Sequence, residues 1–362
     1  MQSTPSLDQF IPIPQTVTKA AYQAFQDGKS YFGVAHKTIS DRLTEMFLPG
    51  RDKQIKPLSL QTLALLQKLR NQLIETDWQD AENKIYPVSL LFENPWEDFF
   101  RYYPAVWLDM PKIWERVRNK EYQQFDPELD REGYPRYYLQ NFHYQTDGYL
   151  SDWSANLYDL QVEILFNGTA DLMRRRILKP LKEGLSNFAP QPMRVLDVAC
   201  GTGRTLKMIR ATLPKASLFG VDLSPSYLRK ANLLLSENPG ELPQLAQANA
   251  EELPYLDNYF HGVSNVFLFH ELPAEARQRV IEECFRVIQP GGVFVICDSI
   301  QRSDSPEEFQ VMMDNFPTIF HEPYYKHYVT DNLVERLEEA GFQDIKTENH
   351  FVSKYWVARK PA

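Results

Sequence analysis

The residues best placed for chemistry follow a short apolar run in the second half of the chain. The run at 195–198 leads directly into the turn ACGTG at 199–203. Two glycines let the backbone pass close to a ligand, and a helix beginning near Arg204 would point free N–H groups at it. Asp222 ends the next apolar run, where a carboxylate can accept hydrogen bonds from both hydroxyls of a ribose. The spacing therefore predicts a site for a nucleoside ligand.

The surrounding residues narrow the class of nucleoside. A dinucleotide fingerprint needs a third glycine, and Leu206 occupies that position. The turn also lacks the Gly-Lys-Ser/Thr of a phosphate-binding loop, which disfavours ATP and GTP. Asp197, just before the turn, would repel a diphosphate but suits a ligand with an amino group and a sulfonium.

Strands that alternate with helices are predicted to position these residues. Behind a proline-rich break at 187–193, strands are expected at 195–198, 217–221, 245–248, 261–269 and 293–297. Helices are expected at 205–213, from 224 onward, at 274–288 and at 331–340, and two last strands near 342–348 and 353–358. This alternation predicts an α/β fold with a seven-stranded, mostly parallel sheet whose last strand is antiparallel.

Five ordered motifs resemble those of a known family. LDVACGTG at 196–203 is similar to the first motif of class I S-adenosylmethionine-dependent methyltransferases, especially their quinone-biosynthesis-like branch. Four further segments resemble the later motifs of this family, in the same order: VDLS at 221–224, ANAEELP at 248–254, FHGVSNVFLFHEL at 260–272 and RVIQPGG at 286–292. The resemblance covers about 193–360. It implies a Rossmann-like fold, methyltransferase activity, S-adenosylmethionine as cofactor and S-adenosylhomocysteine as product.

The resemblance also implies cofactor contacts, position by position. These are Asp197, Ala199, Gly201 and Gly203 for the amino-acid end, Asp222 for the ribose, Leu223, Asn249 and Ala250 for the adenine, and Asn265 and Phe267 for the methionine side. Two positions depart from the family pattern. Asn249 stands where aspartate is usual, and its amide offers both a donor and an acceptor to adenine. Ala199 replaces the first glycine of the wider motif.

Methyl transfer needs few catalytic groups, because the sulfonium is already an activated electrophile. A base is required only where the nucleophile must lose a proton. His270, just beyond the fourth expected strand, is the candidate base, and the alternative is a structural histidine that caps the sheet edge. Asp298, at the end of the fifth expected strand, is a candidate substrate or helix-capping contact.

Aromatic segments supply the other substrate candidates. The segment NFHYQTDGYL at 141–150 is expected to fold over the methyl donor, with Tyr144 or Tyr149 covering it and His143 facing the substrate. His321 and Tyr324 lie in a long insert after the fifth strand, where this family often builds substrate walls. Packing at a domain interface is the alternative for each of them.

The first part of the chain is predicted to be helical and rich in aromatic residues. Helices are expected at 17–26, 37–47, 59–74, 155–166 and 169–185, and prolines between 86 and 158 exclude one long helix there. We expect two domains, a helical substrate cover at 1–145 and a cofactor-binding domain at 146–362. The arginines at 174–176 are expected on a solvated helix face, with anion binding as the alternative.

The composition of the chain limits the classes of partner that it is expected to bind. The net charge of −9 disfavours nucleic acid as a partner, and the three cysteines have no metal-binding or disulfide spacing. No leader peptide is expected at 1–14, and no apolar run has the length of a membrane span. We therefore expect a cytoplasmic protein with a small-molecule substrate and no metal, and the sequence leaves its oligomeric state open.

The function expected from these features is methyl transfer to a small, apolar or aromatic metabolite. Methylation of protein or nucleic acid is a second interpretation. It is disfavoured because the fourth strand ends in SNVF (264–267), without the Asn/Asp-Pro-Pro-Tyr that grips a flipped base. A non-catalytic protein that binds S-adenosylmethionine is the third interpretation.

Overall fold

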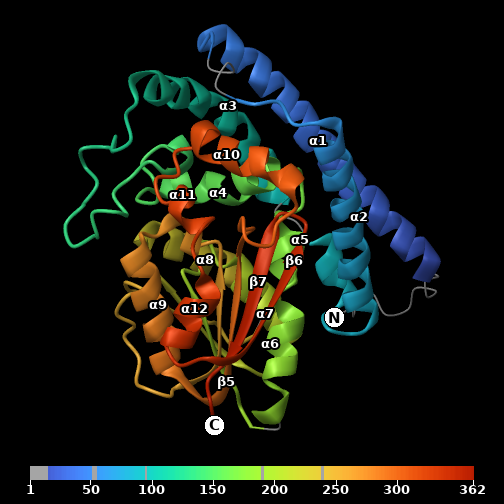
Figure 1. Ribbon diagram of the computed structural model, residues 1–362, viewed down its shortest axis with the longest axis vertical. Coiled ribbons are helices and arrows are strands. Elements are labelled where there is room, and N and C mark those ends of the chain that lie inside the picture. Colours follow the sequence, from blue (N-terminus) through green and yellow to red (C-terminus); the bar gives the residue numbers. More distant parts are fainter. Residues whose placement is uncertain (1–14, 51–54, 94–95, 189–190, 238–239) are drawn as a thin grey trace, which may run out of the picture.

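The computed structural model describes residues 15–50, 55–93, 96–188, 191–237 and 240–362 (Figure 1). The prediction that no leader peptide is present concerns 1–14, which lie outside the described residues. None of the described helices combines the length and the apolar character needed to cross a bilayer.

A seven-stranded sheet forms the centre of the fold, in the order β3-β2-β1-β4-β5-β7-β6. The strands are β1 (Arg194–Val198), β2 (Ser217–Asp222), β3 (Gln244–Gln247), β4 (Phe260–Val266), β5 (Ile288–Ser299), β6 (Gln343–His350) and β7 (Ser353–Arg359). Strands β1 to β5 pair in parallel, whereas β7 is antiparallel to both β5 and β6. The predicted mostly parallel sheet with an antiparallel last strand is confirmed.

Helices cover both faces of this sheet. Successive side chains of a strand point to opposite faces, so Val195 enters one apolar layer and Leu196 the other. The first layer is covered by α6 (Leu178–Gly184), α7 (Arg204–Thr212) and α8 (Pro225–Leu235), and the second by α9 (Ala274–Val287) and α12 (Leu333–Glu339) (Figure 1). Burial on both sides explains why the central strands are almost continuously apolar.

Further helices cross the edge at which the parallel strands end (Figure 1). They are α3 (Trp96–Asn119), α4 (Asp152–Leu165), α10 (Gln310–Ile319) and α11 (Tyr325–Tyr328). Short 3-10 turns lie at Val88–Phe92, Phe142–Tyr144, Ser186–Phe188, Phe269–Glu271 and Glu307–Phe309. Ligands of open α/β sheets bind at this edge, so these segments form the surroundings of the predicted site.

The N-terminal helices differ from the predicted ones in length. The two helices expected at 17–26 and 37–47 are one, α1 (Gln15–Phe47). Within it, a Cβ at Gly33 would lie 2.8 Å from the side-chain oxygen of Asn167, so close packing favours glycine there despite its low helix propensity. The helix α2 (Leu60–Glu82) begins at the predicted cap Ser59, whose hydroxyl accepts a hydrogen bond from the Thr62 N–H at 3.0 Å.

As predicted, the segment 86–158 is not one long helix. Within it, helix α3 nevertheless continues through Pro104 and Pro111, where burial of its apolar side against α4 offsets the lost backbone hydrogen bonds. The single helix expected at 169–185 is divided into α5 (Ala170–Arg175) and α6.

Two consecutive arginines join the N-terminal helices to the sheet. The prediction that residues 174–176 form a solvated face is wrong, because all three side chains are buried. Arg175 donates two hydrogen bonds to Asp77 of α2, at 2.9 and 2.7 Å, and Arg176 pairs with Asp80 of the same helix. Buried arginines need such partners, because an unpaired charge in the interior is costly.

The third arginine belongs to a network that reaches the cofactor turn. Arg174 pairs with Asp171 at 3.1 Å, and Asp171 also binds Arg204, the first residue of α7. The helix that begins at the ACGTG turn is thus held by buried charges on α5.

Candidate functional site

The turn after β1 has the backbone that its glycines permit. Ala199, Gly201 and Gly203 all have positive φ, of 54°, 53° and 82°. A Cβ at Gly203 would lie 3.0 Å from the Cβ of Ala231, so this glycine lets α7 approach α8. A Cβ at Gly201 would meet nothing closer than 3.9 Å, so this glycine faces open space. The two glycines therefore have different roles, one in packing and one in leaving room for a ligand.

Asp222 is held at the end of β2 by the same turn. Its Oδ2 accepts a hydrogen bond from the Gly201 N–H at 2.8 Å, and its Oδ1 accepts one from the Ser224 N–H at 2.8 Å. Burial raises the pKa of Asp222 to about 6, although both backbone donors act to lower it. Each carboxylate oxygen keeps a further lone pair that can accept a hydroxyl hydrogen.

A pocket that is partly open to solvent lies beside Gly201 and Asp222. Of the predicted cofactor contacts, it is lined by Tyr149, Ala199, Gly201, Asp222, Leu223, Asn249, Ala250 and Phe267. The other walls include Tyr137, Tyr138 and Tyr158, which precede the sheet in the sequence and were not singled out by its motifs. The pocket is therefore bounded on one side by the sheet edge and on the other by tyrosines.

Three predicted cofactor contacts, Asp197, Gly203 and Asn265, do not line this pocket. The buried carboxylate of Asp197 accepts a hydrogen bond from the Ser264 hydroxyl at 2.7 Å, and burial raises the pKa of Asp197 to about 7. The buried amide of Asn265 donates to the Val198 carbonyl at 2.7 Å, and its Oδ1 has no hydrogen-bond partner among the described residues. Both side chains are buried and are absent from the pocket lining.

The side chain of Asn249 is engaged within its own loop. Its Oδ1 accepts from the Glu251 N–H at 3.0 Å, and its amide donates to the Glu251 carboxylate at 3.3 Å. Glu251 in turn accepts a hydrogen bond from Tyr137. The predicted adenine loop is thus connected to the tyrosine wall, and adenine contact by the Asn249 amide remains a prediction.

The segment at 141–150 is fastened to the start of α8. The Ser224 hydroxyl donates to the Tyr149 carbonyl at 2.6 Å, and the ring of Tyr149 stacks on Phe142. Tyr149 lines the pocket, whereas Tyr144 lies near Tyr122 and His321, away from it. Of the two predicted covers, the structure brings only Tyr149 to the pocket.

His270 and Asp298 form a buried pair. Nδ1 of His270 lies 2.7 Å from the Asp298 carboxylate, which also accepts a hydrogen bond from the Phe269 N–H at 2.7 Å. Burial lowers the pKa of His270, but Asp298 and Glu271 raise it more, so it lies above the usual value. His270 itself does not line the pocket, but its neighbour Glu271 does.

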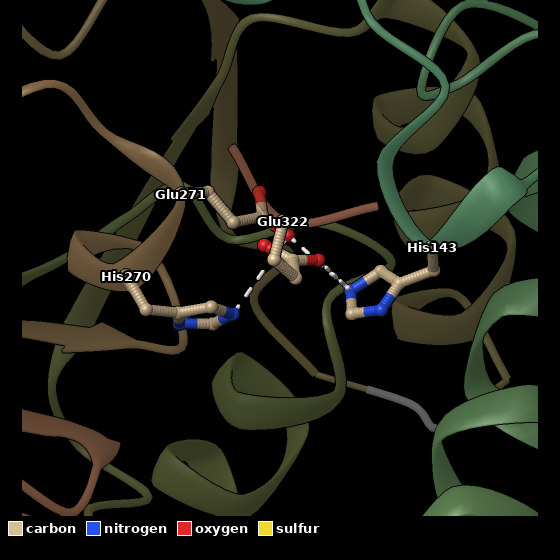
Figure 2. A group of neighbouring side chains, drawn as sticks. All are labelled: His143, His270, Glu271 and Glu322. Atoms are coloured by element: carbon tan, nitrogen blue, oxygen red, sulfur yellow. Dashed lines mark ion pairs between the residues drawn. The ribbon is translucent and has the colours of Figure 1, made fainter. Parts of the chain in front are cut away.

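Two carboxylates that the sequence prediction missed lie beside this pair. Glu271 accepts a hydrogen bond from the Tyr149 hydroxyl, and Glu322 lies 3.1 Å from His143 Nε2 (Figure 2). The sequence holds a trace of them, since the tripeptide Phe-His-Glu occurs both at 269–271 and at 320–322. Only the structure shows that both glutamates face His143.

The remaining substrate candidates do not line the pocket, although the ring of Tyr324 contacts that of the wall residue Tyr137. His321 stacks on Tyr122 with ring centroids 4.2 Å apart, and its Nε2 lies 2.7 Å from the Gln140 side-chain oxygen. Burial and the neighbouring His143 lower the pKa of His321 to about 4. The carbonyl of Tyr324 accepts a hydrogen bond from Arg277 at 3.3 Å. Substrate contact by either residue remains a prediction.

Comparison with known proteins agrees with the fold and the turn. A family model described as a methyltransferase domain matches residues 195–292, which include the ACGTG turn, Asp222 and β4. Residues 195–292 therefore form part of a class I S-adenosylmethionine-dependent methyltransferase domain. S-adenosylmethionine is accordingly the cofactor of this methyltransferase.

The similar proteins cover only part of this methyltransferase. It is 26% identical over 194 residues to demethylmenaquinone methyltransferase of Geobacillus sp. (strain WCH70), and the alignment covers 49% of this chain and 82% of that protein. It is 32% identical over 128 residues to malonyl-[acyl-carrier protein] O-methyltransferase of Methylococcus capsulatus, and this alignment covers 35% of this chain and 44% of that protein. The structure of human N-acetylserotonin methyltransferase in complex with SAM aligns with 77% of this chain and 72% of that one, at 14% identity and a TM-score of 0.49. The chain thus spans less than half of the Methylococcus protein.

The residues of the pocket fit this cofactor. Gly201 leaves open space where a side chain would intrude, and Asp222 offers a carboxylate suited to ribose hydroxyls. Leu223, Ala248 and Ala250 give apolar surface for a purine ring.

Proposed function

We propose that this methyltransferase modifies a small, apolar or aromatic metabolite in the cytoplasm. The observation that carries the proposal is the composition of one pocket. Gly201 and Asp222 line it from the sheet edge, and four tyrosines, at 137, 138, 149 and 158, line it from the segments that precede the sheet. Such walls exclude water and favour contact with apolar or aromatic groups.

Different side chains of the pocket bind the cofactor and orient the reacting groups. Asp222 accepts the ribose hydroxyls, and the tyrosine rings shield the reacting groups from solvent. Bound S-adenosylmethionine supplies an activated methyl group on its sulfonium, so positioning provides most of the rate acceleration. His270 is the proposed proton acceptor, and Asp298 holds its Nδ1 so that Nε2 faces Glu271 at the pocket wall.

The similar proteins support a metabolite or a carrier-bound metabolite as the substrate, since their names give demethylmenaquinone and malonyl-[acyl-carrier protein]. The net charge of −9 also favours this reading over nucleic acid. A cytoplasmic location is supported by three cysteines that are all buried and unpaired.

Incubation with methyl-labelled S-adenosylmethionine tests the proposal. The purified protein is mixed with an extract that contains lipids, polar metabolites, RNA and protein, and the label is followed by chromatography. Label in a small molecule is the expected result, and an Asp222→Asn variant should lose it. Label only in RNA, or in protein that does not release it as a small molecule when a carrier thioester is hydrolysed, would refute the substrate class. Cofactor binding without any transfer would instead identify a non-catalytic binding protein.

A further inference from the structure

Four potential metal-binding side chains converge beside the pocket from three segments that are far apart in the sequence. They are His143, His270, Glu271 and Glu322, and one nitrogen or oxygen of each lies within 4.8 Å of the other three. Figure 2 shows the two imidazoles approaching from opposite sides, with the two carboxylates between them. We propose that these four residues bind a divalent first-row metal ion such as Zn²⁺.

The separations are close to those around a bound metal. Ligand bonds of about 2.0–2.2 Å in a tetrahedral site place neighbouring ligand atoms about 3.3–3.6 Å apart. His143 Nε2 lies 3.1 Å from Glu322 Oε1 and 3.6 Å from Glu271 Oε1, and His270 Nε2 lies 4.0 Å from Glu271 Oε1. Small side-chain movements would bring all four groups to binding distance.

The partner of His270 gives a second, independent observation. Its Nδ1 faces the Asp298 carboxylate at 2.7 Å, so Nδ1 carries the hydrogen, and in the neutral ring Nε2 would present its lone pair to the cluster. Metal-bound histidines are oriented in this way, by a carboxylate that accepts a hydrogen bond from the other ring nitrogen. A neutral His270 would then direct a lone pair at the Glu271 carboxylate, and a cation between them removes that repulsion.

Glu322 gives the third observation. Its side chain has no exposed surface, and neither carboxylate oxygen has a hydrogen-bond partner among the described residues. Its contact within the cluster is the ion pair with His143 at 3.1 Å. A buried carboxylate without hydrogen bonds is costly, and a metal ion would supply the opposing charge. Two protonated imidazoles are the alternative source of that charge, and metal titration separates the two.

The ligand set indicates the class of ion. Imidazole nitrogen suits zinc and the neighbouring transition metals, whereas Mg²⁺ and Ca²⁺ prefer oxygen ligands alone. Two imidazoles and two carboxylates therefore favour Zn²⁺, Fe²⁺ or Mn²⁺. No sequence spacing would reveal such a site, because its ligands come from 143, 270–271 and 322.

The position of Glu271 connects the site to the reaction, an argument that rests on the proposed function. Glu271 lines the cofactor pocket and also belongs to the cluster. A metal held there by four ligands would have to take a fifth to bind an oxygen of the substrate, and it would then lower the pKa of a hydroxyl group. The substrate class is then a metabolite with a hydroxyl or carbonyl oxygen next to the accepting atom. In the metal-bound protein His270 is a ligand, and its proposed role as proton acceptor applies to the metal-free protein.

Metal titration of the full chain tests the site. The protein is treated with chelator, dialysed and titrated with Zn²⁺ by calorimetry and with Co²⁺ by visible absorption, which reports the geometry of its ligands. The variants are Glu322→Gln, His143→Gln and His270→Ala. The matched control is His321→Ala, because His321 is a neighbouring histidine that lies against Gln140 outside the cluster. S-adenosylhomocysteine binding is measured on every sample.

We expect one equivalent of Zn²⁺ to bind, with at least tenfold weaker binding in the three variants and unchanged binding in the control. Absence of Zn²⁺ and Co²⁺ binding in a protein that binds S-adenosylhomocysteine would overturn the metal site and leave the proposed function intact. Equal binding by all variants would also overturn it, since the metal would then lie elsewhere. Metal binding without S-adenosylhomocysteine binding would support the site and refute the proposed cofactor pocket.

Discussion

The replacement Asp222→Asn tests the assignment of the cofactor site most directly. Asp222 holds the turn through the N–H groups of Gly201 and Ser224, both at 2.8 Å, and is proposed to accept the ribose hydroxyls. Asparagine keeps the shape but loses the charge and one acceptor oxygen. A hydrogen bond to a charged group contributes about 1.5–3 kcal/mol. The affinity for S-adenosylhomocysteine should therefore fall about 10- to 150-fold.

The pH dependence gives the same assignment a second readout. The pKa of Asp222 is about 6, and only its ionised form accepts both hydroxyls. Affinity should rise as the pH increases from 5 to about 7 and then become constant. At pH 5 about a tenth of the carboxylate is ionised, so binding should be about tenfold weaker than the plateau. The Asp222→Asn variant should lack this dependence.

Calorimetry with S-adenosylhomocysteine between pH 5 and 8 measures both effects. Asp152→Asn is the matched control, because the Asp152 side chain is 63% exposed and pairs with Arg229 at the surface. Thermal unfolding shows whether each variant is folded. An affinity of Asp222→Asn within threefold of the unmodified protein, or a flat pH profile of that protein, would refute the assignment.

Three further predictions concern stability and are checked by urea unfolding. Burial raises the pKa of Asp197 to about 7, above its value in the unfolded chain, so the ionised carboxylate destabilises the folded protein as the pH rises. Between pH 5 and pH 8 the unmodified protein should lose about 2–3 kcal/mol of unfolding free energy relative to Asp197→Asn. Parallel plots of unfolding free energy against pH for the two proteins would contradict this. Arg175→Met leaves the buried Asp77 without its counter-ion, although the hydroxyls of Tyr22 and Tyr86 still donate hydrogen bonds to it, and should cost about 3–5 kcal/mol. A change under about 1 kcal/mol would argue against the pair. Gly203→Ala should lower the free energy of unfolding by about 1–3 kcal/mol, because Gly203 has a φ of 82°. Gly28→Ala should be neutral or stabilising, because Gly28 lies inside α1 with open space around it. Equal effects of the two replacements would show that the backbone conformation at Gly203 does not matter for stability.

The sheet and the cofactor turn were predictable because their signals are local. The central strands are short apolar runs, whereas β3 and β6 are mainly polar, and the turn at 199–203 has its chemistry within five residues. The parallel order brings the end of β2 beside the end of β1, so Asp222 meets Gly201.

The features that were missed depend on partners far along the chain. Three consecutive arginines at 174–176 are typical of a solvated helix face. In the structure Arg175 is buried, because it pairs with Asp77, which lies 98 positions earlier in the chain. Helix α1 continues through Gly33 because Asn167 packs against that glycine. Glu271 and Glu322 both face His143, and this arrangement depends on a loop and an insert whose positions the sequence pattern does not specify.

The buried pairs between α2 and α5 bear on how far the two regions can be separated. A chain that began at residue 146 would keep Arg175 and Arg176 but lack Asp77 and Asp80, leaving two guanidinium groups without counter-ions at a newly exposed apolar surface. Swapping α2 between related enzymes would meet the same obstacle. A hybrid that retains these arginines would have to inherit α2 with them, so α2 and the sheet are expected to evolve as a single inherited unit.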